Sequence, residues 1–62
     1  SNLKIKHFMT KKPFMVEENI LAAEALSLMN RKKITNACVY KKENKRKTIG
    51  VLHIHNILEN LK

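Results

Sequence analysis

Cysteine, glycine, proline and aromatic residues are all scarce in this sequence. Cys38 is the only cysteine, so no disulfide can form within the chain. One thiol and three histidines, His7, His53 and His55, also offer few ligands for a structural metal. A chain of 62 residues buries only about 60% of the surface that its unfolded form exposes, so its stability is marginal without a disulfide or a structural metal. We therefore expect a partner subunit to supply the missing burial.

Long hydrophobic runs are missing as well. No apolar stretch approaches the roughly 18 residues that a membrane span needs, and no signal-peptide core is present. A lone thiol suits a reducing compartment, so we expect a cytoplasmic protein without a membrane partner. No methionine precedes Ser1, so we expect residues 1–2 to be a remnant of protein expression. Residues 3–62 are then one folded motif, a fragment of a larger protein.

Acidic residues are few, at 5 against 13 lysines and arginines, and the formal net charge is +8. Such an excess is typical of nucleic-acid binding. The basic residues cluster, however, where we expect loops or helix ends, at residues 11–12, 31–33 and 41–47. Aromatic rings, on which single-stranded nucleic acids stack, are nearly absent. We therefore favour solvated basic loops and predict no nucleic-acid partner, with a small basic nucleic-acid-binding domain as an alternative.

The first half of the chain predicts a lead-in, a short strand and a helix. Residues 3–9 allow one helical turn, which Pro13 prevents from continuing. Residues 14–16 are a brief apolar run that suits a strand. Asn19 can cap an amphipathic helix from Ile20 to about Lys33. The residues that we expect on its apolar face are Leu21, Ala22, Ala25, Leu26, Leu28 and Met29.

The second half predicts a hairpin and a second helix. Residues 37–40 and 48–52 are strand-forming runs on either side of a polar turn at 41–46. The last segment places Ile54, Ile57, Leu58 and Leu61 at helical spacing. The predicted fold is therefore α+β, in the order β-α-β-β-α, with a small three-stranded sheet and two amphipathic helices. So few residues can hardly cover both helices, and we expect a similar unit to pack against this one.

This order of elements resembles a CBS (cystathionine β-synthase) motif over nearly the whole chain. The matching pieces are Phe8-Met9-Thr10, Pro13, Val16, Ala23-Glu24-Ala25-Leu26, Met29-Asn30, Lys33-Ile34-Thr35-Asn36 and Ile49-Gly50-Val51-Leu52. The resemblance implies that two motifs pack together through their sheets and helices. It also implies that the clefts between them bind adenosine nucleotides such as ATP, ADP or AMP, and that binding regulates an attached enzyme or transporter. An isolated motif is then expected to form a homodimer.

A narrower resemblance concerns the stretch from Gly50 to Leu58 and the segment Lys33-Ile34-Thr35. Both are similar to the second CBS motif of bacterial arabinose-5-phosphate isomerases, which carry a sugar-isomerase domain followed by two CBS motifs. Those enzymes supply a sugar precursor of lipopolysaccharide or capsule. The resemblance therefore implies a parent isomerase whose catalytic residues lie outside this chain.

The resemblance also implies a nucleotide site at the junction of the last strand and the last helix. Nucleotide-binding motifs have there a glycine, a Ser or Thr that meets phosphate beside the helix amides, and an Asp that binds the ribose. The matching residues are Gly50, His53 and Asn56, so both side-chain positions depart from the pattern. Without Asp, the charge-assisted acceptor is lost. The implied binding residues are Thr10, Pro13, Lys33, Ile34, Thr35, Asn36, Gly50, His53 and Asn56.

Simpler roles exist for most of these side chains. His53 and Asn56 can cap the last helix. A metal at His53 and His55 is disfavoured, because residues two apart on a helix diverge by about 200°. On a strand the two rings could share a face, but no third ligand is evident. Cys38 reads as a small buried hydrophobe, and no catalytic constellation is present. We therefore predict a regulatory or interaction module without enzymatic activity, with a purely structural, ligand-free dimerisation module as the alternative.

Overall fold

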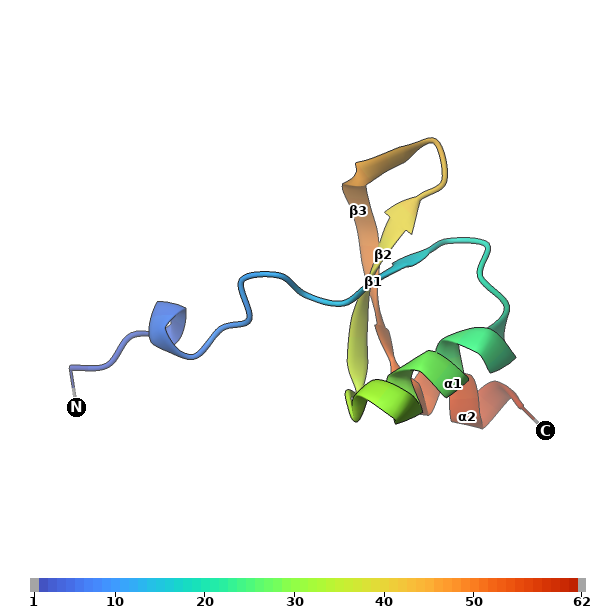
Figure 1. Ribbon diagram of the computed structural model, residues 1–62, viewed down its shortest axis with the longest axis horizontal. Coiled ribbons are helices and arrows are strands. Elements are labelled where there is room, and N and C mark those ends of the chain that lie inside the picture. The colour runs from blue at the N-terminus through green and yellow to red at the C-terminus, as the bar shows by residue number, and fades with distance from the viewer. Residues whose placement is uncertain (1, 62) are drawn as a thin grey trace.

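The computed structural model describes residues 2–61. A three-stranded sheet carries two helices, and an extended arm precedes them (Figure 1). The elements are the 3₁₀ turn η1 (Ile5–His7), β1 (Met15–Glu17), α1 (Ala22–Lys32), β2 (Asn36–Lys41), β3 (Asn44–His53) and α2 (Ile54–Asn60). The predicted α+β class and the order β-α-β-β-α are confirmed. None of the helices within residues 2–61 has the length and apolarity needed to cross a membrane.

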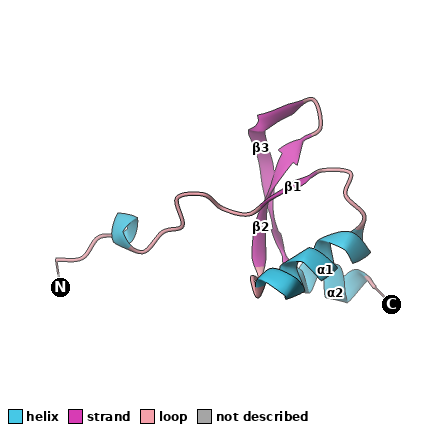
Figure 2. Ribbon diagram, in the orientation of Figure 1, coloured by secondary structure: helices cyan, strands magenta, loops and turns pink. Residues whose placement is uncertain are grey.

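The sheet has the order β1-β2-β3. β1 runs parallel to β2 and β3 runs antiparallel to it. Because side chains alternate between the two faces of a strand, Val16 and Ala37 point to one face and their neighbours to the other. Both helices lie on the face of Val16 and Ala37, and the other face carries no helix (Figure 2).

The core between the sheet and the helices is small. Met29 is fully buried, and the buried hydrophobic residues are Val16, Ala25, Met29, Ala37 and Ile57. A ring of half-buried apolar side chains surrounds them, among them Phe14, Leu26 and Ile34. The chain therefore depends on a handful of contacts for its stability, as its length implies.

The predicted start of α1 is wrong by two residues. Asn19 does not cap the helix, because it lies two residues before the N-cap; its side-chain amide donates a hydrogen bond to Glu17 Oε1 at 3.2 Å. A turn follows, in which the Ile20 amide donates to the Glu17 carbonyl at 3.0 Å. Leu21 then takes the N-cap position without a side-chain hydrogen bond. Leu21 is 72% exposed and so does not join the apolar face on which it was expected.

The hairpin turn is shorter than predicted. It consists of residues 42–43, and β3 begins at Asn44 instead of residue 48. The Lys42 amide donates to Glu18 Oε2 at 2.8 Å, which holds the turn to the segment that follows β1. Near the turn the register between β2 and β3 shifts, since Val39 pairs with Gly50 and Tyr40 pairs with Thr48.

The sheet face opposite the helices is apolar and uncovered. Met15, Cys38 and Val51 lie in one cross-strand row. By strand alternation, the apolar residues of this open sheet face are Met15, Cys38, Tyr40, Ile49 and Val51. The same rule places Glu17, which pairs with Tyr40, and the pair Asn36 and His53 at its edges. Val51 is 68% and Ile49 is 49% exposed. Cys38 is only half-buried here, less than the buried small hydrophobe that we predicted, because its neighbours Ala37 and Val39 face the helices and Cys38 faces away from them.

Candidate functional site

The junction between β3 and α2 lies beside the segment that enters β2. Asn36 pairs with His53 across the two strands. The Ile54 amide donates a hydrogen bond of 2.8 Å to the Thr35 carbonyl. Because β1 runs parallel to β2, the start of β1 and the start of β2 lie toward the same end of the sheet. The segment that enters β2 and the residues that open α2 therefore meet at one end of the sheet.

His53 and Asn56 cap α2 reciprocally. His53 has an extended backbone (φ −98, ψ 140) and its Nδ1 accepts a hydrogen bond from the His55 amide at 3.1 Å. Asn56 Oδ1 accepts from the His53 amide at 3.1 Å. These are the bonds of a capping box, built here from histidine and asparagine. Since Nδ1 accepts, a neutral His53 carries its proton on Nε2, which can donate to a ligand.

The structure brings some of the predicted binding residues together and leaves others apart. Ile34, Thr35 and Asn36 adjoin the junction, and Ile34 also packs against the core. Lys33 precedes them in the left-handed conformation (φ 55, ψ 43) that ends α1. The other three predicted residues lie outside the junction. Thr10 and Pro13 are exposed in the N-terminal arm, and Gly50 sits three residues back along β3, about 10 Å by strand rise.

The predicted divergence of the His53 and His55 rings is wrong. Their centroids are 4.7 Å apart and the rings stack with an interplanar angle of 18°. Divergence was predicted for a helical backbone at both residues, whereas His53 is the extended N-cap, and an extended backbone lets the two rings share a face. Within residues 2–61, no group of three or more histidine, cysteine or acidic residues is arranged to hold a metal ion.

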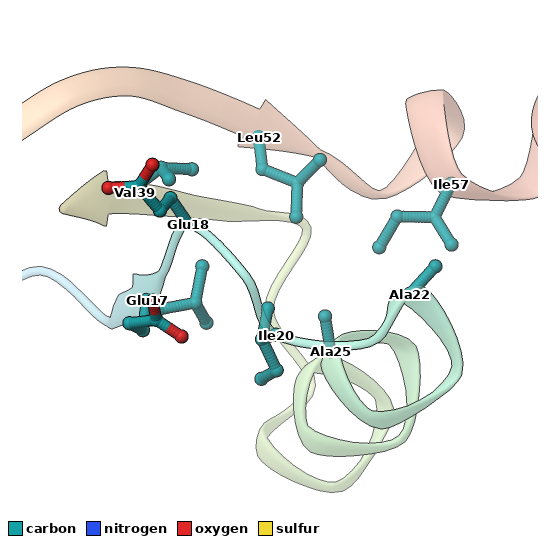
Figure 3. A pocket seen from close by; sticks show the side chains of 9 residues that line it. Glu17, Glu18, Ile20, Ala22, Ala25, Val39, Leu52 and Ile57 are labelled. Atoms are coloured by element: carbon teal, nitrogen blue, oxygen red, sulfur yellow. The ribbon is translucent and has the colours of Figure 1, made fainter. Parts of the chain in front are cut away.

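Sequence patterns missed a hollow between β1, α1 and α2. It has a volume of about 200 Å³, and Figure 3 shows apolar side chains from both helices and the sheet meeting in it. Its lining residues are Val16, Glu17, Glu18, Ile20, Ala22, Ala25, Val39, Leu52 and Ile57. None of the predicted binding residues lines it. We call it the acid-rimmed hollow, after Glu17 and Glu18.

Replacing His53 with alanine is expected to weaken α2. The substitution removes the acceptor for the His55 amide, and loss of a cap costs about 1 kcal/mol. For a domain of this size, that corresponds to a fall in melting temperature of roughly 4–8 °C. Circular dichroism during heating measures the change, with His55→Ala as the matched control because that variant keeps both capping bonds. Equal melting temperatures for His53→Ala and the wild type would contradict the capping role.

Comparison with known proteins supports the fold and the order of its elements. The family model for the CBS domain matches residues 5–62. An uncharacterized protein of Rickettsia prowazekii (strain Madrid E) is 42% identical over 50 residues, which cover 81% of this chain and 15% of that protein. CBS domains are regulatory modules that typically pair with a second CBS motif. From its βαββα fold and this match over nearly its entire length, the chain belongs to the CBS domain family.

Proposed function

We propose that this chain is a regulatory CBS module that pairs with a second copy of itself through the open sheet face. The observation that carries the proposal is the exposure of that face. Val51 and Ile49 are 68% and 49% exposed on a sheet whose other face is covered by both helices. A contiguous exposed apolar patch marks an interaction surface. Pairing two such faces buries the patch and enlarges a core that is otherwise very small.

An adenosine nucleotide is the ligand that we propose for the cleft formed by the pair. The end of the sheet where Asn36 pairs with His53 would line that cleft. Lys33 is exposed near it and supplies positive charge for a phosphate. His53 Nε2–H supplies a neutral donor to the same group. Asn56 can hydrogen-bond a ribose through its side-chain amide, although without the charge of the usual Asp.

The parent protein that we propose is a cytoplasmic sugar-phosphate isomerase. This part of the proposal rests on the likeness of Gly50 to Leu58 to the second CBS motif of arabinose-5-phosphate isomerases. The chain spans only 15% of its Rickettsia relative, so that protein has ample length for a further domain. The activity, substrate and location of the parent are part of the proposal.

A second candidate function is structural pairing without a ligand. It is favoured by the hydrogen bonds at the junction. Asn56 Oδ1 and His53 Nδ1 are already occupied by backbone amides. A ligand that needed either atom would have to break a cap, which costs about 1 kcal/mol. In this case the module fixes the geometry of an assembly and nothing more.

A thermal-shift titration with ATP, ADP, AMP and a sugar nucleotide tests the ligand, with light scattering to measure mass. We expect a dimer whose melting temperature rises with one nucleotide and saturates. At a ligand concentration 100 times the Kd, the stabilisation is about 2.7 kcal/mol. Lys33→Ala is expected to weaken this shift, while Lys47→Ala on the hairpin serves as a control of equal charge.

The contrary results separate the two candidate functions. A dimer that no nucleotide stabilises would leave structural pairing as the function. A monomer at every protein concentration would refute the pairing itself.

A further inference from the structure

The N-terminal arm, residues 2–13, is apolar, basic and uncovered. Every residue in it is exposed, including Ile5 at 81%, Phe8 at 69% and Met9 at 55%. Figure 1 shows the arm running away from the sheet and both helices. Within it, η1 is a single turn that holds itself through local bonds, such as the Lys4 amide donating to His7 Nδ1 at 3.0 Å.

An isolated turn of this kind gains too little from its own hydrogen bonds to persist in water. Its apolar side chains also gain nothing while they remain exposed, because their stabilisation scales with the area removed from water. The arm therefore has the composition of a segment that becomes ordered on a surface. The charged residues of the arm are Lys4, Lys6, Lys11 and Lys12, and it has no acidic residue. A surface that binds it should therefore carry negative charge beside an apolar floor.

The acid-rimmed hollow has the matching chemistry. Its floor is apolar, and Glu17 and Glu18 are its only charged lining residues. These are 2 of the 5 acidic residues in the chain. Its volume of about 200 Å³ is below the roughly 300 Å³ of the smallest usual ligand pockets, so it suits one or two side chains better than a nucleotide.

We propose that the arm of one copy docks in the acid-rimmed hollow of a second copy. Phe8 and Ile5 are the anchors, and the arm lysines face Glu17 and Glu18. The arm precedes β1, which begins at Met15, whereas the acidic rim of the hollow is at the opposite end of β1, formed by its last residue Glu17 and by Glu18 after it. The direction of the arm thus favours docking on a neighbour over folding back. Reciprocal exchange of two arms is a closed arrangement that is compatible with twofold symmetry.

This inference rests on the proposed pairing and adds a second contact to it. Arm exchange would bury apolar side chains that the open sheet face does not reach. It would also place positive charge on the most acidic part of a chain whose formal net charge is +8. Charge complementarity of this kind sets orientation and register between partners.

Cross-linking between single-cysteine proteins tests the exchange. In a Cys38→Ser background, one protein carries Met9→Cys in the arm and the other carries Ala22→Cys at the hollow. Mixed and treated with a short bismaleimide, they are expected to form a mixed dimer. The control is Glu43→Cys in the hairpin turn, an exposed site outside the hollow, which is expected to give much less product with the Met9→Cys protein.

A second measurement is the dissociation constant of the dimer. Phe8→Ser is expected to raise the Kd of the dimer about tenfold or more, as the loss of a buried aromatic anchor does. Lys11→Ser serves as the arm control with a smaller effect. Because Phe8 and Lys11 are both exposed, neither variant should alter the fold.

Failure of the exchange and failure of the pairing give different results. A dimer by light scattering without the mixed cross-link would overturn the exchange and leave the sheet pairing intact. An intrachain cross-link in a protein carrying both Met9→Cys and Ala22→Cys, formed at high dilution, would overturn it in favour of folding back. A monomer at every concentration would refute the pairing and the exchange together.

Discussion

Val51→Glu is expected to convert the paired module into monomers while leaving its secondary structure unchanged. Val51 is 68% exposed and lies opposite Cys38 in the row that crosses the open sheet face. In a monomer, the carboxylate of the variant stays in water and costs little. In a pair it would lose its hydration in an apolar interface, where an unpaired charge is strongly unfavourable. We expect the dimer Kd to rise at least about 100-fold.

Two readouts and one control make this result specific. Light scattering gives the mass, and the reactivity of Cys38 toward a thiol reagent reports whether the open sheet face is covered. Cys38 is expected to be protected in the wild type and to react quickly in Val51→Glu. Leu58→Glu is the matched control, because Leu58 is 49% exposed on α2, on the other side of the sheet. If Leu58→Glu dissociates the pair and Val51→Glu does not, the interface is formed by the helices instead.

Met29→Ala is expected to remove a large part of the free energy of unfolding of this chain. Met29 is fully buried at the centre of the core. Truncating a buried methionine to alanine costs about 2–5 kcal/mol. At roughly 0.05–0.15 kcal/mol per residue, a domain of 62 residues has only about 3–9 kcal/mol of stability in total. One substitution therefore removes a large part of what holds the fold.

Urea unfolding followed by circular dichroism measures the loss. Leu28→Ala, on the same helix but only half-buried, is the control and should cost less. The two variants should be compared at equal protein concentration, because pairing adds to the apparent stability. Equal midpoints for the two variants would show that the core is not centred on Met29.

The elements could be predicted because each carries its own periodicity. The helical spacing of apolar residues such as Ala25 and Met29 predicted the middle of α1, and a short apolar run predicted β2. The ends of the elements were harder to predict. Asn19 offers the side chain of an N-cap, yet the turn from Glu17 to Ile20 delays the start of the helix to Ala22. The first half of β3 is charged, so it showed no strand pattern, and pairing with β2 across the turn determines it.

The site was only partly predictable for a different reason. The sequence order placed His53 and Asn56 at a helix start, and their capping role could be anticipated from residue type alone. The stacking of His53 on His55 depends on the extended backbone of the N-cap, which the sequence does not encode locally. The acid-rimmed hollow joins β1, α1, β2, β3 and α2. No window of sequence contains such a site, because it exists only after the sheet and helices have packed.

The charge on β3 also bears on how copies of this molecule can aggregate. β3 is an outer strand of the sheet, and its outer side could template pairing with another chain. Lys45, Arg46 and Lys47 are exposed along it, so two such strands brought side by side would repel each other. β1, the opposite outer strand, has only 3 residues and offers little to extend. Both outer strands therefore disfavour fibril-like growth of the sheet. Part of the positive charge of the chain opposes aggregation and needs no binding partner to explain it.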